Sequence, residues 1–176
     1  MKEEIESIKN YALENNVPIM QDDGINYLTN YIKKNKIKKI LEIGTAIGYS
    51  AIMMCLVDND IEVTTIERDE KRYLEAIKNV KKFKLEDRIN LIYNDALEVK
   101  INETYDLIFI DAAKAQNTKF FEKFERNLRD GGSIITDNMY FHGLVFKDEE
   151  DIGSRNLRQL VRKVKNYTLF LEKNNA

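Results

Sequence analysis

A turn almost bare of side chains separates an apolar strand from an apolar helix in the segment KKILEIGTAIGYSAIMM, residues 38–54. Gly44 and Gly48 would let a ligand approach the main chain there, and the helix that begins near Tyr49 offers unpaired backbone N–H groups. Glu42, just before the glycines, would repel a diphosphate but suits a positively charged ligand. The spacing G-x-x-x-G also differs from the G-x-G-x-x-G of diphosphate-binding turns. By itself, the turn is equally compatible with an ordinary strand-to-helix connection.

Two further elements occupy corresponding positions after later strands. Glu67 follows the strand at 62–66, where an acidic side chain can accept hydrogen bonds from both ribose hydroxyls of an adenosine. Asn94, Asp95 and Ala96 follow the next strand, where an adenine amino group could be bound. Together with Glu42 and the glycine turn, these elements resemble the site of class I methyltransferases. The ligand that this resemblance implies is S-adenosylmethionine, which carries an ammonium and a sulfonium and no phosphate.

Oxygen-bearing side chains follow two other strands. Asp111 ends the strand YDLIFI, and Asp137 and Asn138 follow the strand SIIT. If these strands are neighbours, about 4.8 Å apart, the three side chains converge, and an all-oxygen set favours a hard cation such as Mg²⁺. Lys114 lies just beyond Asp111, and a nearby cation disfavours its ammonium form, which makes it a candidate general base. The alternatives are helix or turn caps for the Asp and Asn side chains and a solvated Lys114.

The elements that carry these residues alternate along the chain. Apolar runs predict strands at residues 37–43, 62–66, 89–93, 105–110 and 133–136. Apolar residues at helical spacing predict helices at residues 3–15, 22–34, 69–83, 117–128 and 154–171. The inner face of the helix at 69–83 is expected to carry Tyr73, Ile77 and Val80. Strands alternating with helices over short connections predict an α/β fold with a parallel sheet covered on both faces, and ligands bind at the carboxyl ends of such strands.

Length and composition indicate a single soluble domain. The 176 residues are 43% hydrophobic and 33% charged, with a net charge of −2 that gives no overall nucleic-acid signature. No apolar run approaches the roughly 20 residues that span a bilayer, and no signal-peptide pattern opens the chain. Cys55 is the only cysteine, so we expect no disulfide partner and a cytoplasmic location. We predict one domain, with N-terminal helices at 1–36, a ligand and metal core at 37–138, and a loop and basic helix at 139–176.

Four segments in order resemble the cation-dependent O-methyltransferases of the catechol and caffeoyl-CoA type: VPIM (17–20), LEIGTAIGYSA (41–51), FIDAAKAQ (109–116) and ITDNMYFHGLV (135–145). Within that family, the resemblance is greatest to the group that methylates 5-hydroxyuridine to 5-methoxyuridine at the wobble position of bacterial tRNA. The resemblance implies a Rossmann-like fold and a magnesium site formed by Asp111, Asp137 and Asn138. It implies a catalytic role for Lys114 and Asp111, and a donor site formed by Met20, Glu42, Gly44, Ser50, Glu67, Ala96 and Asp111.

Two substrates remain open at this point. For tRNA, the basic helix would neutralise phosphates, and Tyr140 or Phe141 would stack on an unpaired base. The candidate tRNA contacts are Arg155, Arg158, Arg162 and Lys163. For a small catechol-like or phenolic substrate, the metal would chelate hydroxyl groups and the basic helix would be incidental. A non-catalytic S-adenosylmethionine-binding module is a third alternative, and the metal residues with Lys114 argue against it. We read His142 as a loop residue.

The family usually has two more strands after the basic helix, an antiparallel pair that completes the sheet. The chain ends at Ala176, so the sequence predicts only five strands, with the strand SIIT at an edge. We therefore expect a fold less stable than that of a longer relative, whether the pair was lost or lies outside this sequence. A homodimer is also expected.

Overall fold

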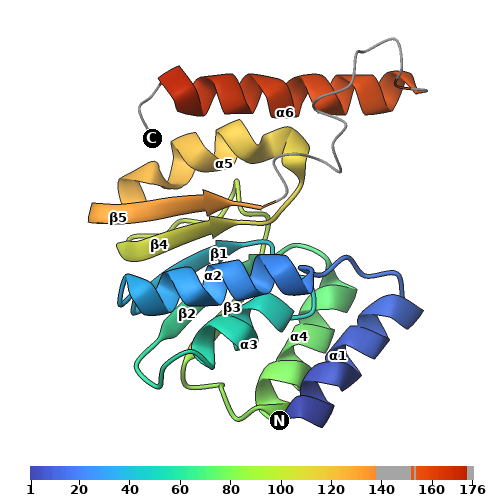
Figure 1. The fold of residues 1–176 in the computed structure, drawn as a ribbon, viewed down its shortest axis with the longest axis vertical. Helices are drawn as coiled ribbons and strands as arrows, with labels where there is room; N and C mark the ends of the chain where they lie inside the picture. The colour runs from blue at the N-terminus through green and yellow to red at the C-terminus, as the bar shows by residue number, and fades with distance from the viewer. Residues whose placement is uncertain (138–151, 153, 174–176) are drawn as a thin grey trace.

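The computed structural model describes residues 1–137, 152 and 154–173 (Figure 1). Asn138, Tyr140, Phe141 and His142, to which the sequence assigned a metal ligand, two stacking rings and a loop position, lie outside the described residues. The described helices and strands, in chain order, are α1 (Lys2–Glu14), α2 (Asp22–Lys34), β1 (Lys39–Ile43), α3 (Tyr49–Cys55), β2 (Glu62–Glu67), α4 (Glu70–Lys82), β3 (Ile89–Tyr93), β4 (Tyr105–Ile110), the 3₁₀ helix η1 (Lys114–Gln116), α5 (Asn117–Phe124), the 3₁₀ helix η2 (Glu125–Asn127), β5 (Leu128–Thr136) and α6 (Arg155–Lys173).

The five strands form one parallel sheet in the order β3-β2-β1-β4-β5, as the alternation of strands and helices predicted. The strand order reverses between β1 and β4, so the carboxyl ends of these two strands frame the crevice in which such sheets bind ligands. The expected adjacency of the strands YDLIFI and SIIT is confirmed, with Ile110 opposite Thr136.

The predicted start of the last strand was wrong. β5 begins at Leu128 rather than Ser133, and the preceding helix ends at Phe124 before the short turn η2. The stretch Leu-Arg-Asp-Gly-Gly lacks the apolar alternation of a strand. Leu128 lies opposite Tyr105 of β4, and after an irregularity in the register the regular pairing resumes with Ser133 opposite Leu107. Gly131 adopts a φ of +75° in this stretch, a value that local apolar patterning does not predict.

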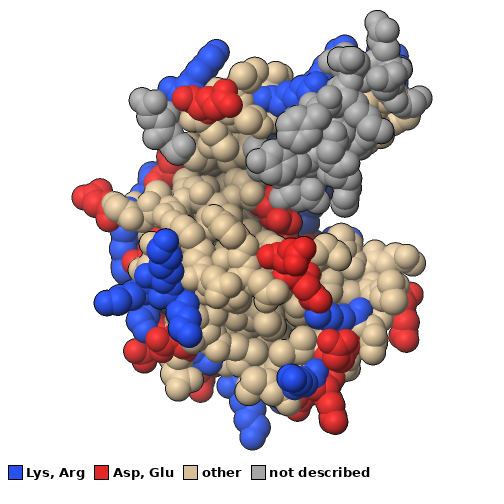
Figure 2. All heavy atoms as spheres, viewed as in Figure 1, with Lys and Arg blue, Asp and Glu red and all other residues tan. Residues whose placement is uncertain are grey.

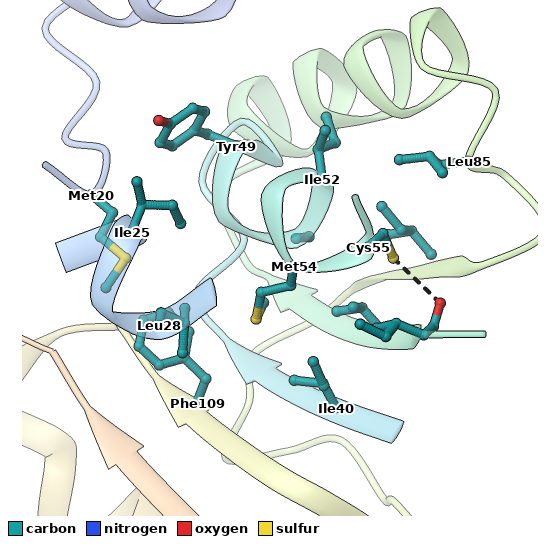
Figure 3. Packing of buried hydrophobic residues seen from close by; sticks show 14 of the residues in the cluster. Met20, Ile25, Leu28, Ile40, Tyr49, Ile52, Met54, Cys55, Leu85 and Phe109 are labelled. Atoms are coloured by element: carbon teal, nitrogen blue, oxygen red, sulfur yellow. Dashed lines mark hydrogen bonds between the residues drawn. The ribbon is translucent and has the colours of Figure 1, made fainter. Parts of the chain in front are cut away.

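The two faces of the sheet carry two apolar clusters. Side chains of α2, α3 and α4 pack on one face, in a cluster that includes Leu28, Met54 and Val80 with Ile40 and Phe109. Figure 3 shows Leu28, Met54, Ile40 and Phe109 of this cluster. On the opposite face, Phe120 and Phe124 of α5 belong to one cluster with residues of β1 and β4, and α6 lies outside α5 (Figure 1). This second cluster includes Phe120, Phe124, Leu41, Ile43 and Ile108.

The inner face of α4 differs from its prediction. Val80 is buried, but Ile77 remains 39% exposed, because Ala76 and Asn79 occupy the positions nearest the sheet. Asn79 donates a hydrogen bond of 2.9 Å to the Ile47 carbonyl, which supports the turn that precedes α3. A buried polar side chain with a main-chain partner cannot be recognised from apolar spacing.

Cys55 lies in the first apolar cluster (Figure 3). Its Sγ atom lies 3.6 Å from the Ile61 carbonyl oxygen, and burial raises the pKa of the thiol to about 12. The thiolate is the reactive form of cysteine, so Cys55 is a structural side chain. Among the helices of the described residues, none is both long and apolar enough to cross a bilayer.

Candidate active site

A cavity of about 340 Å³ lies at the carboxyl ends of the strands, where the sequence predicted a ligand site. The ends of all five strands and the link between α1 and α2 contribute to its wall. The predicted site residues that line it are Met20, Gly44, Glu67, Ala96, Asp111, Lys114 and Asp137. The folded chain therefore brings five of the seven predicted donor residues, together with the described metal residues, to one cavity.

The glycine turn is in close contact with the main chain of Asp111, the residue that follows β4. Gly44 has a φ of +104°, and a Cβ atom there would lie 2.5 Å from the carbonyl oxygen of Asp111. The N–H groups of Gly44 and Thr45 both donate to the Ile66 carbonyl, at 3.0 and 3.2 Å. The absence of a side chain at position 44 is thus required by the protein's own backbone, whatever ligand also approaches the turn.

Glu67 is fixed at the end of β2 by main-chain groups. One carboxylate oxygen accepts the N–H of Ala46 at 2.8 Å, and the other accepts the N–H groups of Arg68 and Asp69 at 2.9 and 2.8 Å. A carboxylate offers about four acceptor positions, so these three bonds leave capacity for a hydroxyl in the cavity. The arrangement holds Glu67 in one orientation at the cavity wall.

Glu42 and Ser50, both predicted to contact the donor, are buried beneath the turn and are not among the cavity-lining residues. Ser50 donates a short hydrogen bond to one oxygen of Glu42, and Thr65 donates to the other at 2.5 Å. The Thr65 hydroxyl also lies 2.6 Å from that of Thr45, within the turn. Glu42 therefore belongs to a buried polar network that supports the glycine turn from below.

This burial predicts a pH-dependent stability. Loss of solvation raises the pKa of Glu42 to about 7, and the hydroxyls of Ser50 and Thr65 only partly oppose that shift. Since the folded state binds the proton more tightly, the stabilisation is complete below the unfolded pKa, near 4.5, and is lost as pH rises through 7. Relative to Glu42→Gln, the unmutated chain should lose about 2 to 3 kcal/mol of unfolding free energy between pH 5 and pH 8.

Urea denaturation of the ligand-free protein at both pH values would measure this difference. Glu98→Gln, which changes an exposed carboxylate, is the control and should follow the unmutated chain. A constant difference between Glu42→Gln and the unmutated chain across this range would contradict the assignment.

Asp111 and Asp137 extend the adjacent strands β4 and β5 by one residue each. The Asp111 N–H donates to the Ile43 carbonyl at 2.9 Å, and the Asp137 N–H donates to the Ile110 carbonyl at 3.0 Å. The pKa of Asp111 is raised to about 7, first by burial and then by the negative charges of Asp137 and Glu42, while the charge of Lys114 opposes the rise. Two carboxylates whose charges repel each other in one cavity fit a cation, and their oxygen donors are those that Mg²⁺ prefers.

Of the predicted metal ligands, only these two can be placed. Within residues 1–137, 152 and 154–173, the structure contains no group of three or more His, Cys, Asp and Glu side chains suited to a metal ion. The third predicted ligand, Asn138, is an amide and lies beyond this part of the chain.

A second groove, of about 590 Å³, adjoins the cavity and shares Met20 and Asp137 with it. Its lining combines apolar side chains with charged ones, among which Lys9 pairs with Asp22 at 2.6 Å. The apolar residues are Ala12, Leu13, Val17, Pro18, Ile19 and Met20. A flat apolar group placed in this groove would lie beside Asp137.

The predicted tRNA contacts lie on α6, which packs against η1, the helical turn that begins with Lys114. Arg155, Arg162 and Lys163 are exposed, whereas Arg158 is half-buried and donates to the Ile152 carbonyl at 3.1 Å. Figure 2 also shows basic side chains gathered at the far end of α2, where Lys33, Lys34 and Lys36 are exposed. That second group lies at the amino ends of the strands, away from the cavity.

Comparison with known proteins decides the family. A family model described as O-methyltransferase matches residues 1–169. The chain belongs to the O-methyltransferase family. Membership places it among the O-methyltransferases, the enzymes that transfer a methyl group to an oxygen.

Relatives of this O-methyltransferase include plant enzymes and bacterial structures. It is 30% identical over 165 residues to a caffeoyl-CoA O-methyltransferase of Populus kitakamiensis, and the match covers 89% of this chain and 69% of that protein. It is 30% identical to a flavonoid 3',5'-methyltransferase of Vitis vinifera, covering 84% of this chain but only 65% of that enzyme.

Two solved structures resemble this O-methyltransferase over most of its length. A Staphylococcus aureus protein described as a candidate caffeoyl-CoA O-methyltransferase is 43% identical, with a TM-score of 0.89 over 95% of this chain and 81% of that one. A Bacillus cereus O-methyltransferase, solved in complex with SAH, is 26% identical, with a TM-score of 0.83 over 97% and 79% of the two chains. These matches confirm the Rossmann-like methyltransferase fold.

Sequence reasoning missed several residues that line the site of this O-methyltransferase. Arg68 and Arg72 border the cavity, and Arg68 lies 3.4 Å from Asp95. The sequence did offer a signal for both. Arg68 directly follows Glu67, and Arg72 lies one helical turn after Arg68. Lys9 and Leu13 of the second groove gave no such signal, since they lie on α1, outside the four segments that carry the resemblance.

Proposed function

We propose that this chain transfers the methyl group of S-adenosylmethionine to the 5-hydroxyl of 5-hydroxyuridine at the wobble position of tRNA, with Mg²⁺ as the required cation. One observation carries the proposal: Gly44 and Glu67, which suit the donor, line the same cavity as Asp111, Lys114 and Asp137. The SAH complex of the Bacillus cereus relative supports the choice of donor.

The donor would lie across the glycine turn. Glu67 would accept hydrogen bonds from its ribose, and Ala96 would border its adenine, since both line the cavity at the ends of β2 and β3. Met20, which is almost fully buried, forms part of the wall shared with the second groove. Glu42 and Ser50 would act on the donor through the turn that they support.

Asp111 and Asp137, with Asn138, would hold a Mg²⁺ ion, which when bound stabilises the oxyanion of the acceptor hydroxyl. Lys114 lines the same cavity and would take the proton of that hydroxyl. The chain's own contribution is to hold the acceptor oxygen and the donor methyl group in register, and such positioning accounts for much of the rate in transfer reactions.

The exposed cations of α6 favour tRNA as the acceptor. Arg155 and Lys163 project from a helix that packs against η1, so phosphates bound to them would lie near the Lys114 side of the cavity. The lining of the second groove includes Asp22, Asp23 and Asp137, whose negative charges disfavour phosphates there. A tRNA would therefore place its backbone on α6 and its flipped base toward the groove.

A second candidate is O-methylation of a small catechol-like or phenolic compound. The printed names of the poplar and grapevine relatives refer to a caffeoyl thioester and a flavonoid. The apolar lining residues of the second groove suit an aromatic ring beside Asp137. The same donor and metal residues would serve either acceptor.

Paired assays would separate the two acceptors. The unmutated chain should methylate tRNA that contains hydroxyuridine and leave caffeic acid unmethylated. The double variant Arg155→Gln, Lys163→Gln should bind tRNA more weakly, and the slope of log K against log salt should fall by about one to two. Filter binding at several salt concentrations measures this slope.

The matched control is Lys33→Gln with Lys36→Gln, which removes the same charge from the far end of α2. It should bind tRNA like the unmutated chain. Turnover of caffeic acid without turnover of tRNA would favour the second candidate. Equal weakening in both double variants would show that α6 has no special role.

The expected homodimer and cytoplasmic location remain predictions. Light scattering of the purified chain tests the first, and fractionation of the cells that produce it tests the second.

A further inference from the structure

β5 is held on its two faces by two tyrosine hydroxyl groups from different helices. Tyr31 of α2 lies 2.6 Å from the Ser133 hydroxyl on one face, and Tyr167 of α6 lies 3.0 Å from the Thr136 hydroxyl on the other. Neighbouring residues confirm the two sides, because Ile135 packs with the α2 cluster and Ile134 with the α5 cluster. Side chains of two helices therefore hold β5 at Ser133 and at Thr136.

These contacts matter because β5 has only one neighbouring strand in the described part of the chain, β4. A strand that is hydrogen-bonded to one neighbour is restrained along one edge only. The tilt and twist of such a strand depend on the side chains that pack against its two faces. Thr136 is the last residue of β5, and Asp137 follows it directly. Any shift of Thr136 moves the carboxylate of Asp137 in the cavity.

The ring of Tyr167 is itself immobilised. Its side chain is 1% exposed, and it packs against Phe121 and Phe170 with ring centroids 6.4 and 6.2 Å away. Tyr167 is absent from the residues that line the cavity and the groove, so it has no route to donor or acceptor. Within the described residues, the Tyr167 hydroxyl makes one hydrogen bond, to the Thr136 hydroxyl.

We propose that Tyr167 is a positioning residue, which sets the place of Asp137 for a divalent cation through its hydrogen bond to Thr136. The inference rests on the proposed function, because it takes Asp137 as a metal ligand. Mg²⁺ requires nearly ideal octahedral geometry, so a small displacement of one carboxylate weakens binding. Residues that orient metal ligands from outside typically change metal affinity by about 10- to 100-fold, and Tyr167 acts one residue further away.

Tyr167→Phe keeps the ring and removes the hydroxyl. Its dissociation constant for Mn²⁺, measured by electron paramagnetic resonance and checked by Mg²⁺ competition, should rise about three- to tenfold. At saturating Mg²⁺, the turnover number should stay within about twofold of the unmutated value, because the chemistry does not use Tyr167. Thr136→Val removes the same bond from the other side and should weaken Mn²⁺ binding equally, and the double variant should be no weaker than either single variant.

Tyr31→Phe is the matched control. It removes the other tyrosine hydroxyl that contacts β5, but that hydroxyl bonds Ser133, four residues before Asp137. It should melt at about the same temperature as Tyr167→Phe and bind Mn²⁺ like the unmutated chain. Unchanged Mn²⁺ affinity in Tyr167→Phe, or equal weakening in Tyr31→Phe, would overturn the inference and leave the proposed function standing. An unmutated chain that binds no divalent ion would overturn both.

Discussion

Replacement of Asp137 by alanine is expected to reduce Mg²⁺-dependent methyl transfer at least about a thousandfold, and to change the affinity for S-adenosylhomocysteine less than about threefold. A bound cation contributes several kcal/mol of charge stabilisation to the transition state, and about 4 kcal/mol corresponds to this factor. The donor residues Gly44 and Glu67 belong to other strand ends and keep their main-chain contacts. Radiolabelled methyl transfer and calorimetric titration measure the two effects.

The same change relieves repulsion within the cavity. The charge of Asp137 raises the pKa of Asp111, so in Asp137→Ala the pKa of Asp111 should fall toward its ordinary range. The ligand-free variant should consequently be no less stable than the unmutated chain near neutral pH. Asp130→Ala, an exposed position on the same strand, is the control and should leave activity unchanged. Full activity of the unmutated chain in EDTA, or of Asp137→Ala in Mg²⁺, is incompatible with the proposed site.

Gly44→Ala is expected to destabilise the fold by about 3 kcal/mol or more and to weaken S-adenosylhomocysteine binding at least about a hundredfold. The backbone at φ +104° disfavours any side chain, with a strain of about 1 to 3 kcal/mol. The new Cβ would also lie 2.5 Å from the Asp111 carbonyl oxygen, a main-chain atom that cannot rotate away. The glycine turn and Asp111 would have to separate, which deforms the donor and metal parts together.

Gly131→Ala is a control that separates the cost of backbone strain at a positive φ from the cost of a steric clash with a neighbouring atom. Gly131 also has a positive φ, +75°, but a Cβ there would meet no atom within 4 Å. Its cost should be only the backbone strain, about 1 kcal/mol, with donor binding unchanged. Urea denaturation and calorimetric titration of the two variants give the comparison. Equal losses of stability in the two variants would show that contact with Asp111 does not decide the requirement for glycine at position 44.

Most of the fold could be predicted from local pattern. Apolar runs and helical spacing identified the five strands and their flanking helices because each element shows its burial in a short stretch of sequence. β4 illustrates this, since YDLIFI matches its observed bounds, Tyr105–Ile110. β5 illustrates the limit, because its first half is glycine-rich and polar and lies at an irregularity in the pairing with β4, which local apolar pattern does not predict.

The site divides in the same way. The sequence predicted which residues follow the strands, and a parallel sheet brings all such residues to one edge, so Gly44, Glu67, Asp111 and Asp137 meet in one cavity. The direction of a side chain at that edge is a different matter. Glu42, one residue before Ile43 on the same strand, turns into the protein to meet Ser50 and Thr65.

The sequence by itself therefore determined the class of fold, the edge of the sheet that carries the chemistry, and the residue types available there. Tertiary structure alone decided that Gly44 touches the Asp111 main chain, that Glu42 is buried, and that Tyr167 reaches Thr136. The physical reason is the separation along the chain of the residues that make contact. Periodicity reports how each residue relates to its nearest neighbours along the chain, whereas these contacts join segments brought together only when the helices pack on the sheet.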